Sequence, residues 1–279
     1  MKQDIAILLC VYDSALWLPQ LLNSLYAQSC QDFQILVHDD GSRDDTLSIL
    51  EKYRQQYGKL EIDYDSCPGR KAMGSFIWLL ERHPGYRYYM FCDHDDVWLP
   101  EKIALTLEKM QECEAARPHS PVVVNTDLTV VDRDLHVIHP SFWKYNGIDR
   151  PLLSDFNYLT VCNAFTGCTM MINSQARDLS LPVGPHAMMH DKWIALKVAD
   201  CRDGVLAYVE KPTILYRQHG DNEIGAQAVG GKYYLRRLRH LRDSLRQNRQ
   251  TLAMSRDIRP FTVLEYMYYK IMYFLRRRP

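Results

Sequence analysis

The sequence predicts an α/β fold in which a mostly parallel central sheet is flanked by helices and followed by a helical extension at the C-terminus. Two observations lead to this prediction. Over roughly the first 100 residues, short apolar runs are each followed by a polar turn and then by a segment with helical periodicity, which is the pattern of parallel β/α units. From residue 231 onward, basic segments with helical spacing replace this pattern.

The expected elements follow one another in a regular order. The predicted strands are 5–11, 35–37, 60–64, 88–92, 121–125, 128–131 and 165–172. The predicted helices are 18–25, 44–57 and one through residues 76–80, and a later helix opens at Asp191. Polar residues gather where the strands end, and the carboxyl ends of parallel strands share one edge of a sheet. A ligand site is therefore expected at that edge.

Size and composition restrict the class of protein. A chain of 279 residues that is 47% hydrophobic can bury a full core, and we expect one main domain over residues 1–225 with an appendage over 226–279. The formal net charge of zero argues against a surface built for nucleic acid. The eight cysteines form no CxxC pair, which favours reduced thiols in a cytoplasmic protein. The apolar run 5–11 is too short for a signal peptide or a membrane span.

An acidic cluster, Asp93-His94-Asp95-Asp96, directly follows one of the predicted strands. Its three carboxylates repel one another, and a bound divalent cation converts that repulsion into attraction. Mg²⁺ or Mn²⁺ suits such oxygen ligands and would neutralise the charge of a departing diphosphate. The alternative is an acidic turn that caps the helix beginning near Pro100.

A second acidic pair, Asp39-Asp40, ends a different predicted strand and precedes the turn residues Gly41-Ser42. Either carboxylate is suited to accept a hydrogen bond from a nucleotide base or a ribose hydroxyl, and capping of the next helix is the alternative. Because Asp44-Asp45-Thr46 is better placed for capping, we expect Asp39 and Asp40 to have little structural role.

These motifs occur in an order that resembles glycosyltransferase family 2. They are Val11-Tyr12-Asp13, Asp39-Asp40-Gly41-Ser42-Arg43-Asp44-Asp45-Thr46 and Asp93-His94-Asp95-Asp96-Val97-Trp98. The similarity runs from about residue 3 to residue 220. Within the family the chain is most similar to bacterial rhamnosyltransferases of surface-polysaccharide synthesis, through Asp95-Asp96-Val97-Trp98-Leu99-Pro100-Glu101-Lys102 and Tyr216-Arg217-Gln218-His219-Gly220.

The resemblance implies a GT-A fold, a nucleoside-diphosphate-sugar donor, a divalent metal and inversion at the anomeric carbon. The implied nucleotide-binding residues are Val11, Tyr12, Asp13, Asp39, Asp40 and Asp93, and the implied metal ligands are Asp93, Asp95 and His219. The favoured donor is dTDP-rhamnose, with UDP- or GDP-linked sugars as alternatives. The family often has Asn where this chain has Asp13, and a Gly-x-x-x-Asn-like element where it has residues 69–76.

The family's general base usually lies in a Glu-Asp pair that opens a helix, and the matching position here is His190-Asp191. Asp191 is therefore the candidate base, with N-capping as its alternative role, and His190 is a departure from the family pattern. The residues expected near the acceptor or the diphosphate are Asp96, Lys71, Trp98, Gly167, His190 and Trp193. The acceptor, a glycan or a lipid-linked glycan, is expected between residues 140 and 190.

The C-terminal segment is basic and amphipathic. Leucine and tyrosine recur at helical spacing from Tyr234 to Leu252 while arginines occupy the other faces, and 261–275 is an apolar segment that contains Glu265 and Lys270. We expect both to lie on the inner face of the cytoplasmic membrane without crossing it. Packing on the main domain or dimerisation is the alternative.

Three other functions compete with glycosyl transfer. A sugar-phosphate nucleotidylyltransferase would need a Gly-rich basic phosphate loop near the N-terminus, and the sequence has none. A non-catalytic, membrane-bound glycan- or nucleotide-binding protein would not need the intact acidic residues. Nucleic-acid binding by the arginine-rich tail would leave the acidic clusters without a role.

Overall fold

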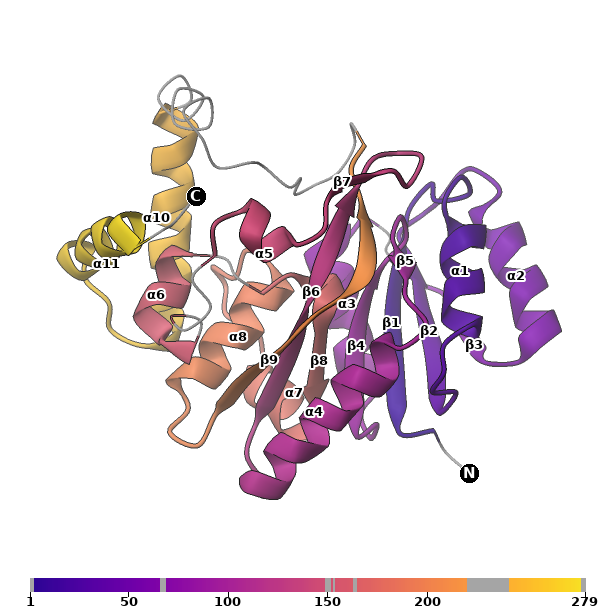
Figure 1. The fold of residues 1–279 in the computed structure, drawn as a ribbon, viewed down its shortest axis with the longest axis horizontal. Coiled ribbons are helices and arrows are strands. Elements are labelled where there is room, and N and C mark those ends of the chain that lie inside the picture. Colours follow the sequence, from indigo (N-terminus) through magenta and orange to yellow (C-terminus); the bar gives the residue numbers. More distant parts are fainter. Residues whose placement is uncertain are drawn as a thin grey trace.

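A nine-stranded mixed sheet forms the centre of the molecule (Figure 1). The computed structural model describes residues 3–65, 69–148, 152, 154–162, 165–219 and 241–276. In these residues the strand order is β3-β2-β1-β4-β8-β6-β9-β5, and β7 pairs with β6. The predicted class, an α/β fold with C-terminal helices, is confirmed.

The first half of the sheet is parallel, as predicted. It consists of β1 (Ile5–Val11), β2 (Phe33–Asp39), β3 (Leu60–Asp63) and β4 (Tyr88–Asp93). The connecting helices are α1 (Leu18–Tyr26), α2 (Thr46–Tyr57) and α3 (Lys71–Arg82). Nearly every residue of β1 is buried, because helices cover both faces of a parallel sheet.

The second half of the sheet is mixed. It consists of β5 (Val97–Trp98), β6 (Val122–Val131), β7 (Val137–His139), β8 (Met170–Asn173) and β9 (Val205–Arg217). β8 is antiparallel to both β4 and β6, whereas β9 runs parallel to β6 and antiparallel to β5. β8 therefore begins at the edge where β4 ends.

Two predictions in this half were wrong, and one long strand was not predicted. The expected strands 121–125 and 128–131 form one continuous strand, β6. The expected strand 165–172 begins instead with a 3-10 turn, Gly167–Thr169, and β8 starts only at Met170. No strand was predicted over β9, whose first residues are partly exposed and whose interior contains Pro212, a residue that is rare inside strands.

Helices cover the two faces of the sheet in separate sets. α1, α2 and α4 (Lys102–Ala116) contribute to the apolar core on one face, together with part of the short helix α5 (Phe142–Tyr145). The core on the other face includes α3, α6 (Phe156–Val161), α7 (Ser174–Ser180) and α8 (His190–Asp200). The helix predicted to open at Asp191 is therefore confirmed as α8.

The described part of the C-terminal segment consists of α10 (Leu241–Ile258) and α11 (Val263–Arg276). Both pack on the face that carries α6 and α8, with contributions to the core from Leu252, Met254 and Tyr273. The expected tail helix begins at residue 231, and its residues before 241, like the domain boundary at 225/226, lie outside the described residues. Within the described ranges, every helix is too short or too polar to span a membrane.

Candidate active site

Three of the sequence motifs meet at one edge of the sheet. β1 lies between β2 and β4, and Val11 is paired with Asp39 while Cys10 is paired with Asp93. The segments that leave these strands therefore lie next to one another, as expected for the carboxyl edge of a parallel sheet. Tyr12, which follows β1, has 53% of its surface exposed at this edge.

The loop after β2 uses both of its carboxylates on the protein backbone. Asp39 Oδ2 accepts hydrogen bonds from the N–H groups of Gly41 (3.2 Å) and Ser42 (3.1 Å). Asp40 accepts from the N–H groups of residues 69, 70 and 71 at 2.7, 2.8 and 2.9 Å. The expectation that these carboxylates have little structural role was wrong, because Asp40 holds the beginning of α3 in place.

The loop after β1 is tied to the loop after β2. Asp13 has a left-handed backbone (φ +43°), its Oδ1 accepts from Arg43 N at 2.7 Å, and its N–H donates to Ser42 Oγ at 3.0 Å. Lys71, at the start of α3, also has a positive φ (+60°) and an exposed side chain. The predicted nucleotide-binding residues therefore form one connected set of loops.

The acidic cluster after β4 contains the pair expected to hold a metal. His219 Nε2 lies 2.8 Å from Asp95 Oδ2, although the two residues are 124 positions apart. Trp17 stacks on the His219 ring with a centroid distance of 5.7 Å. The structure thus brings a carboxylate and an imidazole, both suitable donors for a divalent cation, to one point at the site.

Asp96, the residue after Asp95, is 1% exposed. Its Oδ1 accepts from Arg217 N at 3.2 Å, whereas within the described residues its Oδ2 has no hydrogen-bond partner. Burial, followed by the charges of Asp95 and Asp93, raises the pKa of the Asp96 carboxyl well above its usual value. A buried oxygen without a partner next to other carboxylates is what a cation site needs before the ion binds.

A ligand atom from each of Asp93, Asp96 and Cys168 lies within 4.8 Å of the other two. Burial raises the pKa of the Cys168 thiol well above its usual value, so the thiol stays protonated at neutral pH. The oxygens of Asp93 and Asp96, not the sulfur, are then the donors that suit Mg²⁺ or Mn²⁺. The residues present fit a divalent cation.

Two further residues support the cluster, and the sequence analysis gave neither a role. Lys102 is fully buried, its Nζ lies 4.5 Å from the centre of the Trp98 ring, and burial lowers its pKa to about 8. Arg217 donates from Nε to the Asp95 carbonyl oxygen at 2.8 Å, which fixes β9 against the cluster. Lys102 lies in the motif 95–102, and Arg217 lies in the motif 216–220. Trp98, expected near the acceptor or the diphosphate, is a core residue.

The candidate base, Asp191, lies in the first turn of α8 and is 4% exposed. Its Oδ2 accepts from Gly167 N at 3.2 Å and its Oδ1 accepts from Lys192 N at 2.5 Å. The N-cap of α8 is Met189, so N-capping is not the role of Asp191. Cys168, the neighbour of Gly167, reaches Asp93 and Asp96, and the pair 167–168 therefore connects the candidate base to the acidic cluster.

His190 and Trp193 belong to the core beside the candidate base. The His190 ring lies between Phe76 and Phe91, with centroid distances of 4.3 and 4.6 Å, and burial lowers its pKa to about 3. A Cβ on Gly167 would come within 2.5 Å of His190 Nε2, so this position requires glycine. Trp193 Nε1 donates to the Ser180 carbonyl oxygen at 2.8 Å.

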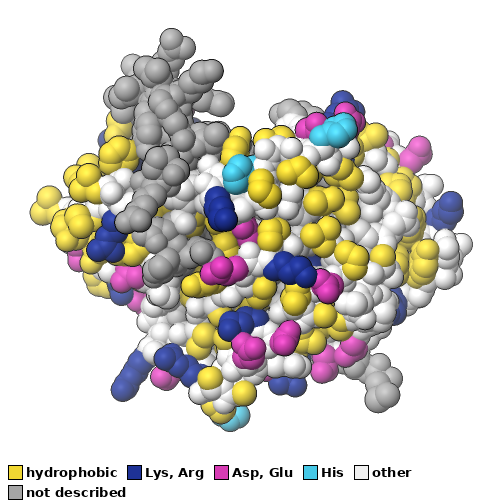
Figure 2. All heavy atoms as spheres, in the orientation of Figure 1, with side chains coloured by type: hydrophobic (Ala, Val, Ile, Leu, Met, Phe, Trp, Pro, Cys, Tyr) yellow, Lys and Arg dark blue, Asp and Glu magenta, His cyan; other side chains and the backbone are white. Residues whose placement is uncertain are grey.

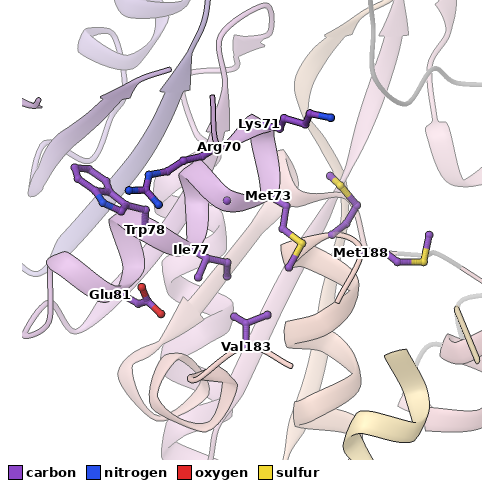
Figure 3. Close-up of a pocket in the computed structure, with 10 residues that line it drawn as sticks. Arg70, Lys71, Met73, Ile77, Trp78, Glu81, Val183 and Met188 are labelled. Carbon is purple, nitrogen blue, oxygen red and sulfur yellow. The ribbon is translucent and has the colours of Figure 1, made fainter. Parts of the chain in front are cut away.

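A pocket of about 420 Å³ lies between α3 and the segment 183–189 that leads into α8 (Figure 3). Met73, Ile77 and Val183 converge on it, with Lys71 at one end and Glu81 at the other. The region expected to hold the acceptor, residues 140–190, includes one wall of this pocket, and α3, which was not predicted to take part, forms the other wall.

Comparison with known proteins agrees with this geometry. The family model described as glycosyl transferase family 2 matches residues 6–178. The chain is 25% identical over 237 residues to the dTDP-rhamnosyl transferase RfbG of Shigella flexneri, covering 78% of this chain and 74% of that protein. Some other relatives are matched over less than half of their length, 42% and 39% in two cases.

Two solved structures share the fold. TarS 1-349 of S. aureus in complex with UDP-GlcNAc aligns with a TM-score of 0.61 and 16% identity over 98% of this chain and 72% of its own. The mannosyltransferase PcManGT of Pyrobaculum calidifontis, in complex with GDP-Man and Mn²⁺, aligns with a TM-score of 0.59 and 14% identity over 99% of this chain and 71% of its own. The family model covers more than half of the chain, and the chain belongs to glycosyltransferase family 2.

Proposed function

We propose that this chain transfers a sugar, with inversion, from a nucleoside-diphosphate sugar to a glycan or lipid-linked acceptor in cell-surface polysaccharide synthesis. The observation that carries the proposal is the connection of two functional groups at one edge: the pair 167–168 joins Asp191 to the acidic cluster. A base and a diphosphate-binding centre must lie on either side of the same sugar carbon, and this connection keeps them close.

The proposed reaction is one in-line displacement. The carboxylate of Asp191 takes the proton of the acceptor hydroxyl while that oxygen forms a bond to the anomeric carbon. The bond from the anomeric carbon to the diphosphate oxygen breaks at the same time, and the nucleoside diphosphate leaves with the electron pair. A divalent cation, when bound by Asp95, His219 and Asp93 with the buried Asp96 carboxylate beside them, would neutralise charge on the leaving diphosphate.

Turnover by an Asp191→Asn variant tests this proposal. The substitution keeps one side-chain oxygen that can accept from Gly167 N or from Lys192 N but removes the proton acceptor, so we expect turnover to fall by ~10²–10⁴ with nucleotide affinity almost unchanged. Asp200→Asn, at the other end of α8, is the matched control and should keep wild-type turnover. Full activity of Asp191→Asn would assign the base to another residue.

The favoured donor is dTDP-rhamnose, because the Shigella relative is described as a dTDP-rhamnosyl transferase. UDP- and GDP-linked sugars are the alternatives, since the two structural neighbours are in complex with UDP-GlcNAc and GDP-Man. Calorimetric titration with dTDP, UDP and GDP, each with and without Mn²⁺, distinguishes them. Metal-dependent binding of a single nucleotide would identify the donor class, and binding of none would favour a non-catalytic member of the family.

We further propose that the protein works as a peripheral protein on the inner face of the cytoplasmic membrane, with α11 in contact with lipid. α11 packs on α6, where the rings of Tyr269 and Tyr158 lie 5.2 Å apart, and its buried side chains are Tyr266 and Tyr273. Its exposed large apolar side chains are Val263, Leu264, Met267, Tyr268, Ile271, Phe274 and Leu275. At about 100° per residue these fall within an arc of about 140°, a continuous apolar face. Figure 2 shows hydrophobic side chains at this end of the molecule.

Charge favours an anionic lipid surface as the partner of this face. Residues 226–279 contain thirteen basic and three acidic residues, although the whole chain is neutral. Arg276, at the end of α11, is exposed beside Leu275. An apolar helix face next to basic residues is typical of helices that lie in the interface of an anionic bilayer.

Sedimentation with phosphatidylglycerol vesicles tests the membrane proposal. Leu264→Glu combined with Ile271→Glu should lower the bound fraction at least about tenfold, because two apolar side chains no longer leave water. Leu47→Glu, an exposed leucine on α2, is the control and should bind like the wild type. Equal binding by all three proteins would exclude α11 as the lipid contact, and a dimer that does not bind vesicles would assign the face to a second copy.

A further inference from the structure

The pocket between α3 and residues 183–189 has an apolar interior and a basic end (Figure 3). Met73, Ile77 and Met188 are among the apolar side chains that line it, and Arg70 and Lys71 lie where α3 begins. α3 follows β3 of the parallel half of the sheet, so its first turn lies at the same edge as the candidate active site. The pocket therefore leads away from the active-site edge along α3.

One wall of the pocket is held by the C-terminal helices. Asp257 of α10 accepts a hydrogen bond from His186 N at 2.9 Å and lies 2.9 Å from His186 Nδ1. Thr251 Oγ1 donates to Met188 Sδ at 3.8 Å. Residues 183–189 lead directly into His190-Asp191 at the start of α8. The segment that forms the wall thus connects the candidate base to the helix that precedes α11.

The lining suits an aliphatic chain better than a sugar ring. Sugars bind through aromatic faces and many hydrogen bonds, yet the Trp78 ring already has the guanidinium groups of Arg70 and Arg82 within 5.5 and 4.7 Å of its centre. Glu81 is the single acidic residue of the lining, and it lies at the end farther from α3's first turn. Apart from Gly74, the remaining walls are methionine, isoleucine and valine, which offer dispersion contacts and no strong hydrogen-bond donors.

We infer that this pocket binds the aliphatic chain next to the phosphate of a lipid-phosphate-linked acceptor, with Lys71 at the phosphate. The inference rests on the proposed function, because it assigns a place to the acceptor of that reaction. The chain would lie along Met73 and Met188 while its phosphate stays at the basic end. An acceptor that comes from the bilayer would arrive from the side of the molecule where α10 and α11 pack (Figure 1).

Binding of farnesyl diphosphate, farnesol and inorganic pyrophosphate to the full chain tests the inference. The titration is done with Mn²⁺ and a saturating amount of the nucleotide that the chain binds, so that the diphosphate probes do not enter the donor site. We expect farnesyl diphosphate to bind at least about tenfold more tightly than pyrophosphate, because one methionine-sized apolar contact already accounts for about tenfold.

Variants locate the binding site. Met73→Gln and Met188→Gln, both at half-buried positions, should each weaken farnesyl diphosphate binding about tenfold, since a polar amide replaces an apolar wall of similar size. Lys71→Gln should weaken binding of farnesyl diphosphate but not of farnesol. Met267→Gln makes the same change on the exposed face of α11 and should bind like the wild type.

Two results would overturn the inference: pyrophosphate binding as tightly as farnesyl diphosphate, or Met267→Gln weakening binding as much as the pocket variants do. Donor turnover, measured on the same preparations, separates this result from the proposed function. Turnover by a protein that binds farnesyl diphosphate no more tightly than pyrophosphate would support the transferase function and contradict the proposed role of the pocket. The opposite result is a protein without turnover that binds farnesyl diphosphate more tightly than pyrophosphate, with binding weakened only by the pocket variants. It would support the proposed role of the pocket and contradict the transferase function.

Discussion

The loops after β2 and β4 each carry adjacent carboxylates at the same edge of the sheet, yet they use them differently. Asp40 accepts hydrogen bonds from three backbone N–H groups at 2.7–2.9 Å. After β4, by contrast, Asp95 meets a histidine side chain from the distant segment after β9, and Asp96 keeps an oxygen without a hydrogen-bond partner in the described part of the chain. Carboxylates whose oxygens accept hydrogen bonds from the backbone hold a loop in place. Carboxylates that contact only side chains, or that keep an oxygen without a hydrogen bond, can bind a cation.

The largest expected effect separates the two loops by metal dependence. Asp95→Asn removes one proposed metal ligand, and because outer partners of metal ligands alone are worth about 10–100-fold in metal affinity, we expect at least about a hundredfold loss of Mn²⁺-dependent nucleotide binding. Calorimetric titration with and without Mn²⁺ measures it.

Asp132→Asn is the matched control for this experiment. It removes the carboxylate of another Asp–His pair, with His136, in the exposed turn after β6, and should leave the titration unchanged. If Asp132→Asn lost metal dependence while Asp95→Asn kept it, the assignment of the metal site to the loop after β4 would be wrong.

A smaller effect is expected for the loop after β2, and it concerns stability. Asp40→Ala leaves three N–H groups at the beginning of α3 without their acceptor. Hydrogen bonds to a charged group contribute about 1.5–3 kcal/mol, so we expect the free energy of unfolding to fall by about 1–3 kcal/mol. Urea denaturation followed by circular dichroism measures the change.

Asp45→Ala controls for the loss of an aspartate in the same loop. Asp45 is the N-cap of α2 but its side chain makes no capping hydrogen bond, so its removal should change stability by less than about 0.5 kcal/mol. Unchanged stability of Asp40→Ala together with lost nucleotide affinity would show that Asp40 serves the nucleotide and not α3.

The parallel half of the sheet and its helices were predictable from sequence because each strand there is a short apolar run between polar turns. Its motifs therefore appeared in the correct places at the edge. The role of Asp40 was not predictable, because its hydrogen-bond donors come from residues 69–71. Those contacts depend on how β3 and α3 return to the edge.

The second half of the site was predicted less well, for a topological reason. β9 and β8 enter the sheet from distant parts of the chain, and the contact between Asp95 and His219 spans 124 positions. The motif 216–220 pointed to His219 but gave no role to Arg217, whose buried guanidinium holds the carbonyl of Asp95. Likewise, the burial of Lys102, Trp98 and His190 follows from packing between elements that the sequence alone does not place together.

A third expected effect, which shows only as a dependence of stability on pH, concerns Lys102, the buried ammonium near Asp96. Burial lowers its pKa in the folded state to about 8 from its usual 10.5. Between these values the unfolded state binds more protons than the folded state, so the wild type gains stability with rising pH. The Lys102→Met variant has no ammonium at this position, so its stability does not include this titration. The stability of the wild type relative to Lys102→Met should therefore be constant below pH 8 and rise by about 2–3 kcal/mol up to pH 10.5.

Urea denaturation across this pH range measures that difference, and taking it between two proteins cancels the titration of the thiols and tyrosines they share. Lys109→Met, on the same helix but exposed and paired with Glu112, is the control. The pair raises the pKa of Lys109, so the wild type should gain no stability relative to Lys109→Met as the pH rises towards 10.5. A flat difference for Lys102→Met would mean that this ammonium, at the start of α4, keeps its usual pKa and that its charge is balanced inside the fold as well as it is in water.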